Sequence, residues 1–182
     1  EFSDETIIDE PFDKKETTGI VLRAYTLMNE NYCLGSFNKM DMWNQRRNVL
    51  AYYGTQEKST YMHMRFMHDD YDFGSAIMTA KQKNSVILGM INFAIDSGDR
   101  HNDLDLVKNS TVSAESMRLS FEIGGNVDDV VLIPNEKENE CSFKNNDIIT
   151  TVKMNFTEFG EYIPKFKVNK NENKIFIESI LY

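Results

Sequence analysis

Hydrophobic and polar residues alternate along several segments of this chain, which is the two-residue period of a β-strand with one buried face. The apolar face comprises Ile20, Leu22, Ala24, Thr26 and Met28 in residues 19–28, Met62, Met64 and Phe66 in residues 60–66, and Met117, Leu119, Phe121 and Ile123 in residues 117–123. Arg23 and Tyr25 point to the opposite face of the first segment. These repeats predict half-buried strands.

Residues 86–95 differ, because they are apolar on both faces apart from Gly89 and Asn92. This pattern predicts a central strand covered on each side, with Leu88 and Met90 buried. Further strands are expected at residues 49–53, 75–80, 130–133, 148–156, 165–168 and 174–182. Clusters of turn-forming residues separate them.

No segment shows the period of a long helix, and residues 103–116 are the best place for one short helix or an irregular excursion. Many short strands without interleaved helices predict an all-β fold, with two antiparallel sheets packed face to face in a jelly roll or related sandwich. A closed barrel is the alternative. We expect residues 19–182 to form a single domain, residues 1–18 to be an N-terminal extension or irregular edge segment, and the chain to be part of a longer protein.

The 182 residues carry a net charge of −9, which opposes binding to a nucleic-acid backbone. No apolar run approaches the length of about 18 residues that predicts a membrane span. We therefore expect neither nucleic acid nor a membrane as a partner. The two cysteines, Cys33 and Cys141, are expected to be separate, reduced and buried thiols, although their spacing leaves a disulfide open.

The segment from Tyr32 to Gly54 gathers the one Trp of the chain, Trp43, with Gln45, Arg46 and Arg47. Aromatic faces, a side-chain amide and guanidinium groups can hold a neutral or acidic sugar chain. In an extended segment the two arginines point to opposite faces, so at most one meets a given ligand. Aromatic residues also form the core of a sandwich, and this alternative stays open.

Two acidic stretches follow predicted strands: residues 68–72, with His68 and Asp70, and residues 96–103, with Asp96, Asp99 and His101. The first stretch has three interpretations: a turn in which Asp binds its own backbone, a calcium loop, or a ligand contact. If the two stretches met, their histidines and carboxylates would line a pocket suited to acid–base chemistry. His63, on an alternating strand, is expected to be packed or at the surface.

Signatures of acyl transfer, phosphate loops and dinucleotide binding are absent from the sequence. The histidines and cysteines do not have chelating spacing, so we expect no transition metal, and we expect no cofactor.

The stretch Tyr32–Phe37, followed by Trp43–Arg47, resembles the start of the β-sandwich portion of heparinase II/III-like enzymes, which degrade polysaccharides with an α/α-toroid domain. Residues 65–73 and 92–99 are similar to turns of such a domain. The resemblance implies an accessory role, because the catalytic residues of those enzymes lie mostly on the toroid. It assigns no catalytic residue in this chain.

The leading hypothesis is thus a non-catalytic module that braces a catalytic domain or binds glycan weakly, and whether the chain has any activity of its own is left open. Its expected partners are a poly- or oligosaccharide and the adjoining catalytic domain, which would place the protein outside the cell or in a periplasm. The alternatives are a small carbohydrate-active enzyme with its site between the two acidic stretches and a structural or protein-interaction domain.

Overall fold

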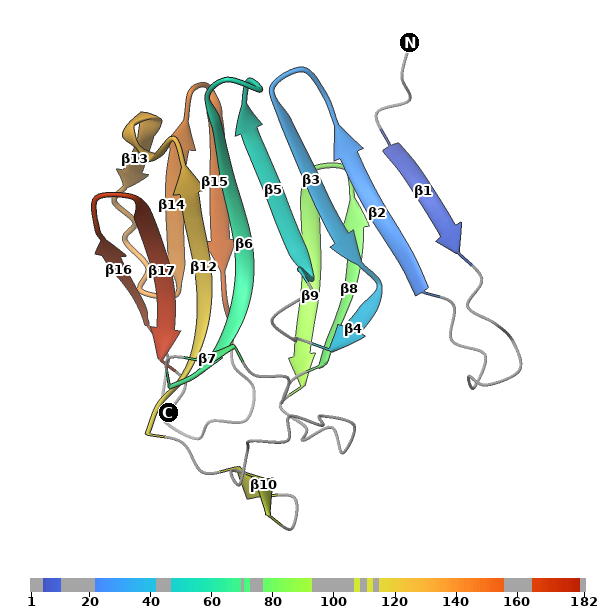
Figure 1. Cartoon of the computed structure of the whole chain (residues 1–182), viewed down its shortest axis with the longest axis vertical. Coiled ribbons are helices and arrows are strands. Elements are labelled where there is room, and N and C mark those ends of the chain that lie inside the picture. The colour runs from blue at the N-terminus through green and yellow to red at the C-terminus, as the bar shows by residue number, and fades with distance from the viewer. Residues whose placement is uncertain are drawn as a thin grey trace.

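The computed structural model describes residues 5–10, 22–41, 47–69, 71–72, 77–92, 107–108, 111–112, 115–155 and 165–180. These residues form seventeen strands and one 3-10 turn, η1 (Val127–Asp129), and all strand pairs among them are antiparallel. The chain is an all-β sandwich, as its alternating pattern predicts (Figure 1).

One layer is a large sheet whose strand order is β1-β2-β3-β5-β6-β12-β17-β16. Its strands are β1 (Glu5–Glu10), β2 (Leu22–Met28), β3 (Tyr32–Phe37), β5 (Val49–Gly54), β6 (Ser59–His68), β12 (Met117–Gly125), β17 (Lys174–Ile180) and β16 (Phe166–Lys170). The short β7 (Tyr71–Asp72) pairs with the end of β6.

The second layer consists of two three-stranded sheets behind the large one (Figure 1). One contains β4 (Lys39–Asp41), β8 (Ile77–Lys83) and β9 (Val86–Asn92), and the other contains β13 (Val130–Ile133), β14 (Glu140–Asn145) and β15 (Ile148–Lys153). A separate pair is formed by β10 (Val107–Lys108) and β11 (Thr111–Val112), so these positions are strand and not the helix considered for residues 103–116.

The core lies between the layers and is built from the inward side chains of alternating strands. The prediction for β6 and β12 is confirmed, because Met62, Met64, Phe66, Leu119, Phe121 and Ile123 are all buried there. Burying a side chain of this size contributes about 1.5–3 kcal/mol. The second layer adds Phe143, which is fully buried and meets the ring of Tyr53 edge-on at 5.7 Å.

Tyr53 also links the two layers through a polar contact. Its hydroxyl lies 2.9 Å from Oγ1 of Thr150 on β15. Burial raises the pKa of this phenol to about 12, although the hydrogen bond to Thr150 opposes the shift. Tyr53 therefore stays neutral and holds β15 against β5.

The prediction of a central, doubly covered strand at residues 86–95 is wrong. β9 pairs only with β8 among the described strands, and its side chains Val86, Leu88 and Met90 are exposed, Leu88 by 76 %. The inward positions are Ile87, Gly89 and Ile91, which line a cleft. Apolar residues on both faces here mark an edge strand with one open face.

The predicted inward face of β2 is also wrong by one residue. The pairing of Leu27 with Leu34 on β3 turns Leu27 into the core, while Met28 is 62 % exposed. A shift of one position moves every side chain of a strand to the other face. The two cysteines are free, but only Cys141 on β14 is buried as expected, whereas Cys33 on β3 is half-buried. Partial or full burial raises the pKa of both thiols.

Replacing Phe121 by alanine should lower the free energy of unfolding by about 3–5 kcal/mol, because it leaves a large cavity between the layers. Urea denaturation monitored by circular dichroism measures this loss. Val131→Ala is the control, since Val131 is exposed on β13 and its truncation should change stability little. A loss below about 1 kcal/mol for Phe121→Ala would contradict the assigned core face.

Candidate functional site

Most of the residues singled out in the sequence lie outside the described part of the chain. These are Trp43, Gln45, Arg46, Asp70, Asp96, Asp99 and His101. His68 is the last residue of β6, and Arg47 is half-buried just before β5. Tyr32 begins β3 and is half-buried beside a cleft between the layers.

Asp69 shows what the start of the first acidic stretch does. Its carboxylate oxygen Oδ1 accepts hydrogen bonds from the backbone N–H groups of Glu115 and Ser116, at 2.9 and 2.8 Å. Its φ of 51° is a turn conformation that Asp adopts more readily than most residues. Asp69 thus has a structural role, but its bonds reach residues 115 and 116 and not the backbone of its own turn, as the turn interpretation had expected. Among the described residues, no three His, Cys, Asp or Glu side chains gather as a metal-binding group.

The outward face of the large sheet carries a cluster of polar side chains that the sequence did not reveal. We call it the Glu122 cluster: Tyr61, His63 and Arg65 from β6, Glu122 from β12 and Lys174 from β17. The two-residue period places the three β6 residues on one face, and antiparallel pairing brings His63 opposite Glu122.

Glu122 is the centre of this cluster, although only 2 % of it is exposed. Its carboxylate accepts hydrogen bonds from Arg65 at 2.5 Å and from the Tyr61 hydroxyl at 3.0 Å, and Lys174 Nζ lies 2.6 Å from Oε1. Nε2 of His63 lies 3.6 Å from Oε2. Two cations thus share one buried carboxylate.

Gly124 makes room for this arrangement. A Cβ atom at position 124 would lie 2.4 Å from the Tyr61 hydroxyl oxygen, so a side chain there would displace the phenol. The Tyr61 ring instead crosses β12 and stacks on the His63 ring, with centroids 5.3 Å apart and planes 10° from parallel. The glycine therefore lets Tyr61 reach Glu122.

Burial alone would raise the pKa of Glu122, but the hydrogen bonds from Lys174 and Arg65, the nearby His63 and the bond from Tyr61 lower it to about 2. The bond to Glu122 also raises the pKa of Lys174. Burial and the same carboxylate raise the pKa of Tyr61. At neutral pH, Glu122 and Lys174 are charged and Tyr61 is neutral, so none of these three is poised to exchange a proton.

A second set of polar contacts extends the same face. Arg118 Nη1 lies 3.7 Å from Glu178 Oε1, and Asn169 donates a hydrogen bond to the other oxygen of that carboxylate at 2.9 Å. Lys167 of β16 is exposed and pairs in register with Glu178. Four cations and two carboxylates therefore occupy the outward positions of β6, β12, β17 and β16, in a chain that is acidic as a whole.

Comparisons with protein-family models, curated proteins and solved structures find no match. The resemblance to the accessory portion of heparinase II/III-like enzymes therefore stays an expectation. In the described part of the chain, no helix has the length and apolar character needed to cross a membrane.

Replacing Glu122 by glutamine should destabilise the protein by about 3 kcal/mol at pH 7, because one unit of pKa shift corresponds to about 1.4 kcal/mol. The pKa falls from 4.5 to about 2 on folding, so this stability is present above pH 4.5 and is lost as the pH drops toward 2. Urea denaturation at several pH values measures the difference between the two proteins.

Glu140→Gln is the matched control, because Glu140 also meets two lysines but lies at the surface, where ion pairs contribute little. A constant difference between wild type and Glu122→Gln across the whole pH range would show that Glu122 does not ionise as described.

Proposed function

We propose that this chain is a non-catalytic β-sandwich module that binds an acidic oligosaccharide on the outward face of its large sheet. The proposal rests on one observation: on the outward positions of β6, β12, β17 and β16, cations outnumber carboxylates and lie beside aromatic rings, although the chain has a net charge of −9. A local basic surface attracts anions even on an acidic protein.

The aromatic part of the surface comes from β5 and β6. Tyr52 pairs directly with Tyr61 across these strands, and 47 % of Tyr52 is exposed. A sugar ring presents a C–H face that packs against a phenol ring, while the hydroxyl of that ring remains available for hydrogen bonding. Tyr52 is thus suited to hold one sugar unit.

The basic part lies beyond Tyr61 on the neighbouring strands. Glu122 holds one side of the Lys174 ammonium, which has three N–H donors, and the Lys174 side chain is 41 % exposed. The remaining donors are suited to a carboxylate or sulfate on the sugar chain. Lys167 provides a further exposed charge on the same face.

The fixed charges of the Glu122 cluster favour binding over catalysis. Its carboxylate is too weak a base and its lysine too weak an acid to transfer protons near neutral pH. In a longer protein, such a module would hold a polysaccharide or brace the domain that acts on it.

Calorimetric titration tests the proposal with three hexasaccharides: a neutral glucan, a uronic-acid polymer and a sulfated form of that polymer. The acidic sugars should bind and the neutral one should bind less tightly, and raising NaCl from about 0.05 M to about 0.3 M should weaken acidic binding. Tyr52→Ala and Lys167→Glu should each weaken it about fivefold, since one exposed contact contributes about 1 kcal/mol.

Lys83→Glu is the matched control, because Lys83 is an exposed lysine on the other layer. Trp43→Ala is titrated in parallel. Absence of binding to both acidic sugars would refute the proposal. Binding by folded proteins that responds to Trp43→Ala alone, and not to Tyr52 or Lys167, would place the site elsewhere.

A further inference from the structure

A cleft separates the two small sheets of the second layer and opens onto the core. Its walls are β9 and β15, and its floor is the large sheet, including Leu34, Met62, Met64 and Phe121. One part has a volume of about 210 Å³. A second part, of about 290 Å³, shares Leu34, Ser85, Thr150 and Thr151 with the first and extends the cleft to Tyr32 and Asp147.

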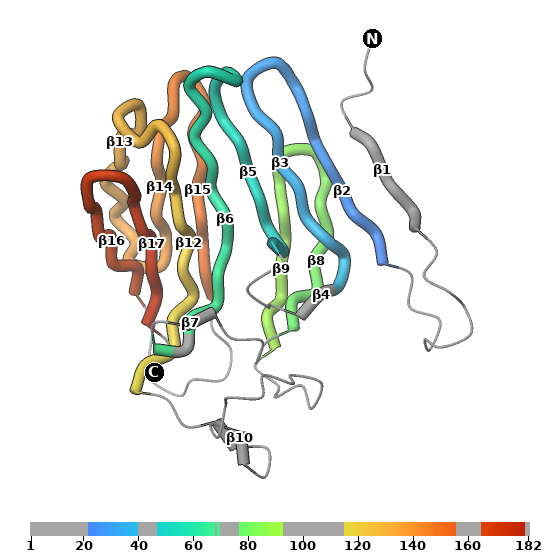
Figure 2. The backbone as a smooth tube through the Cα atoms, viewed as in Figure 1, coloured from blue at the N-terminus to red at the C-terminus, as the bar shows by residue number. Residues whose placement is uncertain are grey.

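Both walls of the cleft are strand edges that no other described strand pairs with. Among the described strands, β9 pairs only with β8, and β15 pairs only with β14 (Figures 1 and 2). An edge strand presents a row of backbone N–H and C=O groups that an added strand can satisfy. A strand entering this cleft would meet such a row on either side.

β9 has none of the features that usually protect an edge. Its sequence, VILGMIN, contains no charge and no proline, and Val86, Leu88 and Met90 expose their side chains. Across the cleft, Ile149 of β15 is 61 % exposed. Natural edge strands are generally short, charged or covered, so this pair of edges is typical of a surface that another chain covers.

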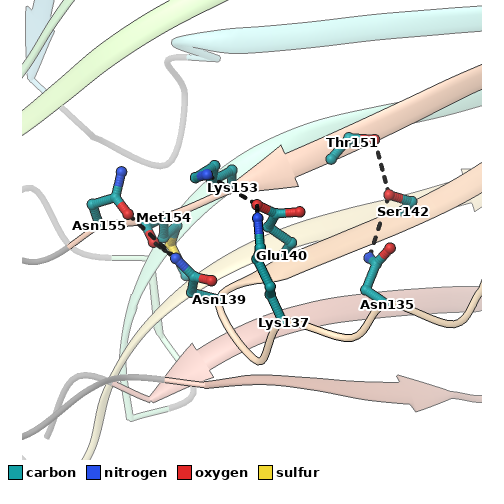
Figure 3. A network of polar contacts seen from close by, with 9 residues as sticks. All are labelled: Asn135, Lys137, Asn139, Glu140, Ser142, Thr151, Lys153, Met154 and Asn155. Carbon is teal, nitrogen blue, oxygen red and sulfur yellow. Dashed lines mark hydrogen bonds and ion pairs between the residues drawn. The ribbon is translucent and has the colours of Figure 1, made fainter.

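The β15 wall is held firmly in place (Figure 3). The hydroxyl of Thr151 lies 2.8 Å from that of Ser142 on β14. Asn139 donates a hydrogen bond to the carbonyl oxygen of Met154 at 2.9 Å. This wall therefore presents a preformed edge, which reduces the entropy lost on binding.

Lysine side chains flank the cleft on the outer faces of the two small sheets, which we call its rim, and Lys153 also lines the cleft itself. Lys81 and Lys83 lie opposite Leu88 and Val86 on the outer face of one sheet, and Lys144 and Lys153 lie on the outer face of the other. Asp147 and Glu140 offset only part of this charge. A partner segment with acidic residues beside its apolar ones complements this rim.

We propose that an extended segment of another polypeptide, with alternating apolar side chains and acidic residues, inserts as a strand between β9 and β15. Its backbone bonds to both edges and joins the two small sheets into one. Its inward side chains enter the cleft above Met62 and Met64. This surface lies on the opposite layer from the proposed oligosaccharide site and is independent of it.

Selection of random decapeptides by display on the intact protein, followed by fluorescence titration of the recovered peptides, tests this proposal. The recovered peptides should share an alternating apolar pattern with acidic residues. Methylating alternate backbone nitrogens of such a peptide should weaken binding at least about tenfold, because each methyl group removes a donor needed by a strand edge. Leu88→Glu and Ile149→Glu should weaken binding by a similar factor.

Val131→Glu is the matched control and should leave binding unchanged, since Val131 is 60 % exposed on β13, away from the cleft. Recovery of no peptide, or binding that N-methylation or both cleft variants leave unchanged in folded protein, would overturn the proposal. Light scattering that shows a dimer, dissociated by Leu88→Glu, would instead assign the cleft to a second copy of this chain.

Discussion

The pairing of β12 with β6 on one side and with β17 on the other is the constraint on which the rest of the molecule depends. It places Leu119, Phe121 and Ile123 in the core and, one residue out of phase, Glu122 on the opposite face. The register that buries these apolar side chains also brings Arg65 and Lys174 to the same carboxylate. A slip by one residue would lose both the core and the ion pairs.

The alternation in β6 and β12 was sufficient to predict the fold class and part of the core, because each strand has one apolar and one polar face. The pattern gave the wrong prediction for β9, where Val86, Leu88 and Met90 are exposed. A strand that is apolar on both faces has the same sequence pattern whether or not other strands of the fold cover it. Which side chains of β2 face the core depends on the pairing of Leu27 with Leu34 of β3, and this pairing cannot be read from the sequence of β2. The Glu122 cluster could not be predicted from the sequence, because His63 and Glu122 become neighbours only through the pairing of β6 with β12.

Each of the two layers carries a different kind of surface. The outward face of the large sheet carries charges whose arrangement is fixed by hydrogen bonds, while the second layer is interrupted by a cleft between two edges that have no further partner among the described strands. Because they lie on opposite sides of the core, ligands at the two surfaces do not compete for space. If both proposals hold, the domain binds two partners at once, one on each layer.

Four methionines line the cleft: Met62, Met64, Met78 and Met154. Methionine is unbranched and its thioether is polarizable, so these side chains can change rotamer and fit apolar groups of different shape. Met78 already fills the space that Gly89 leaves open on β9. These methionines would let the proposed strand vary in sequence, whereas oxidation of their sulfur atoms to sulfoxides would make the cleft polar.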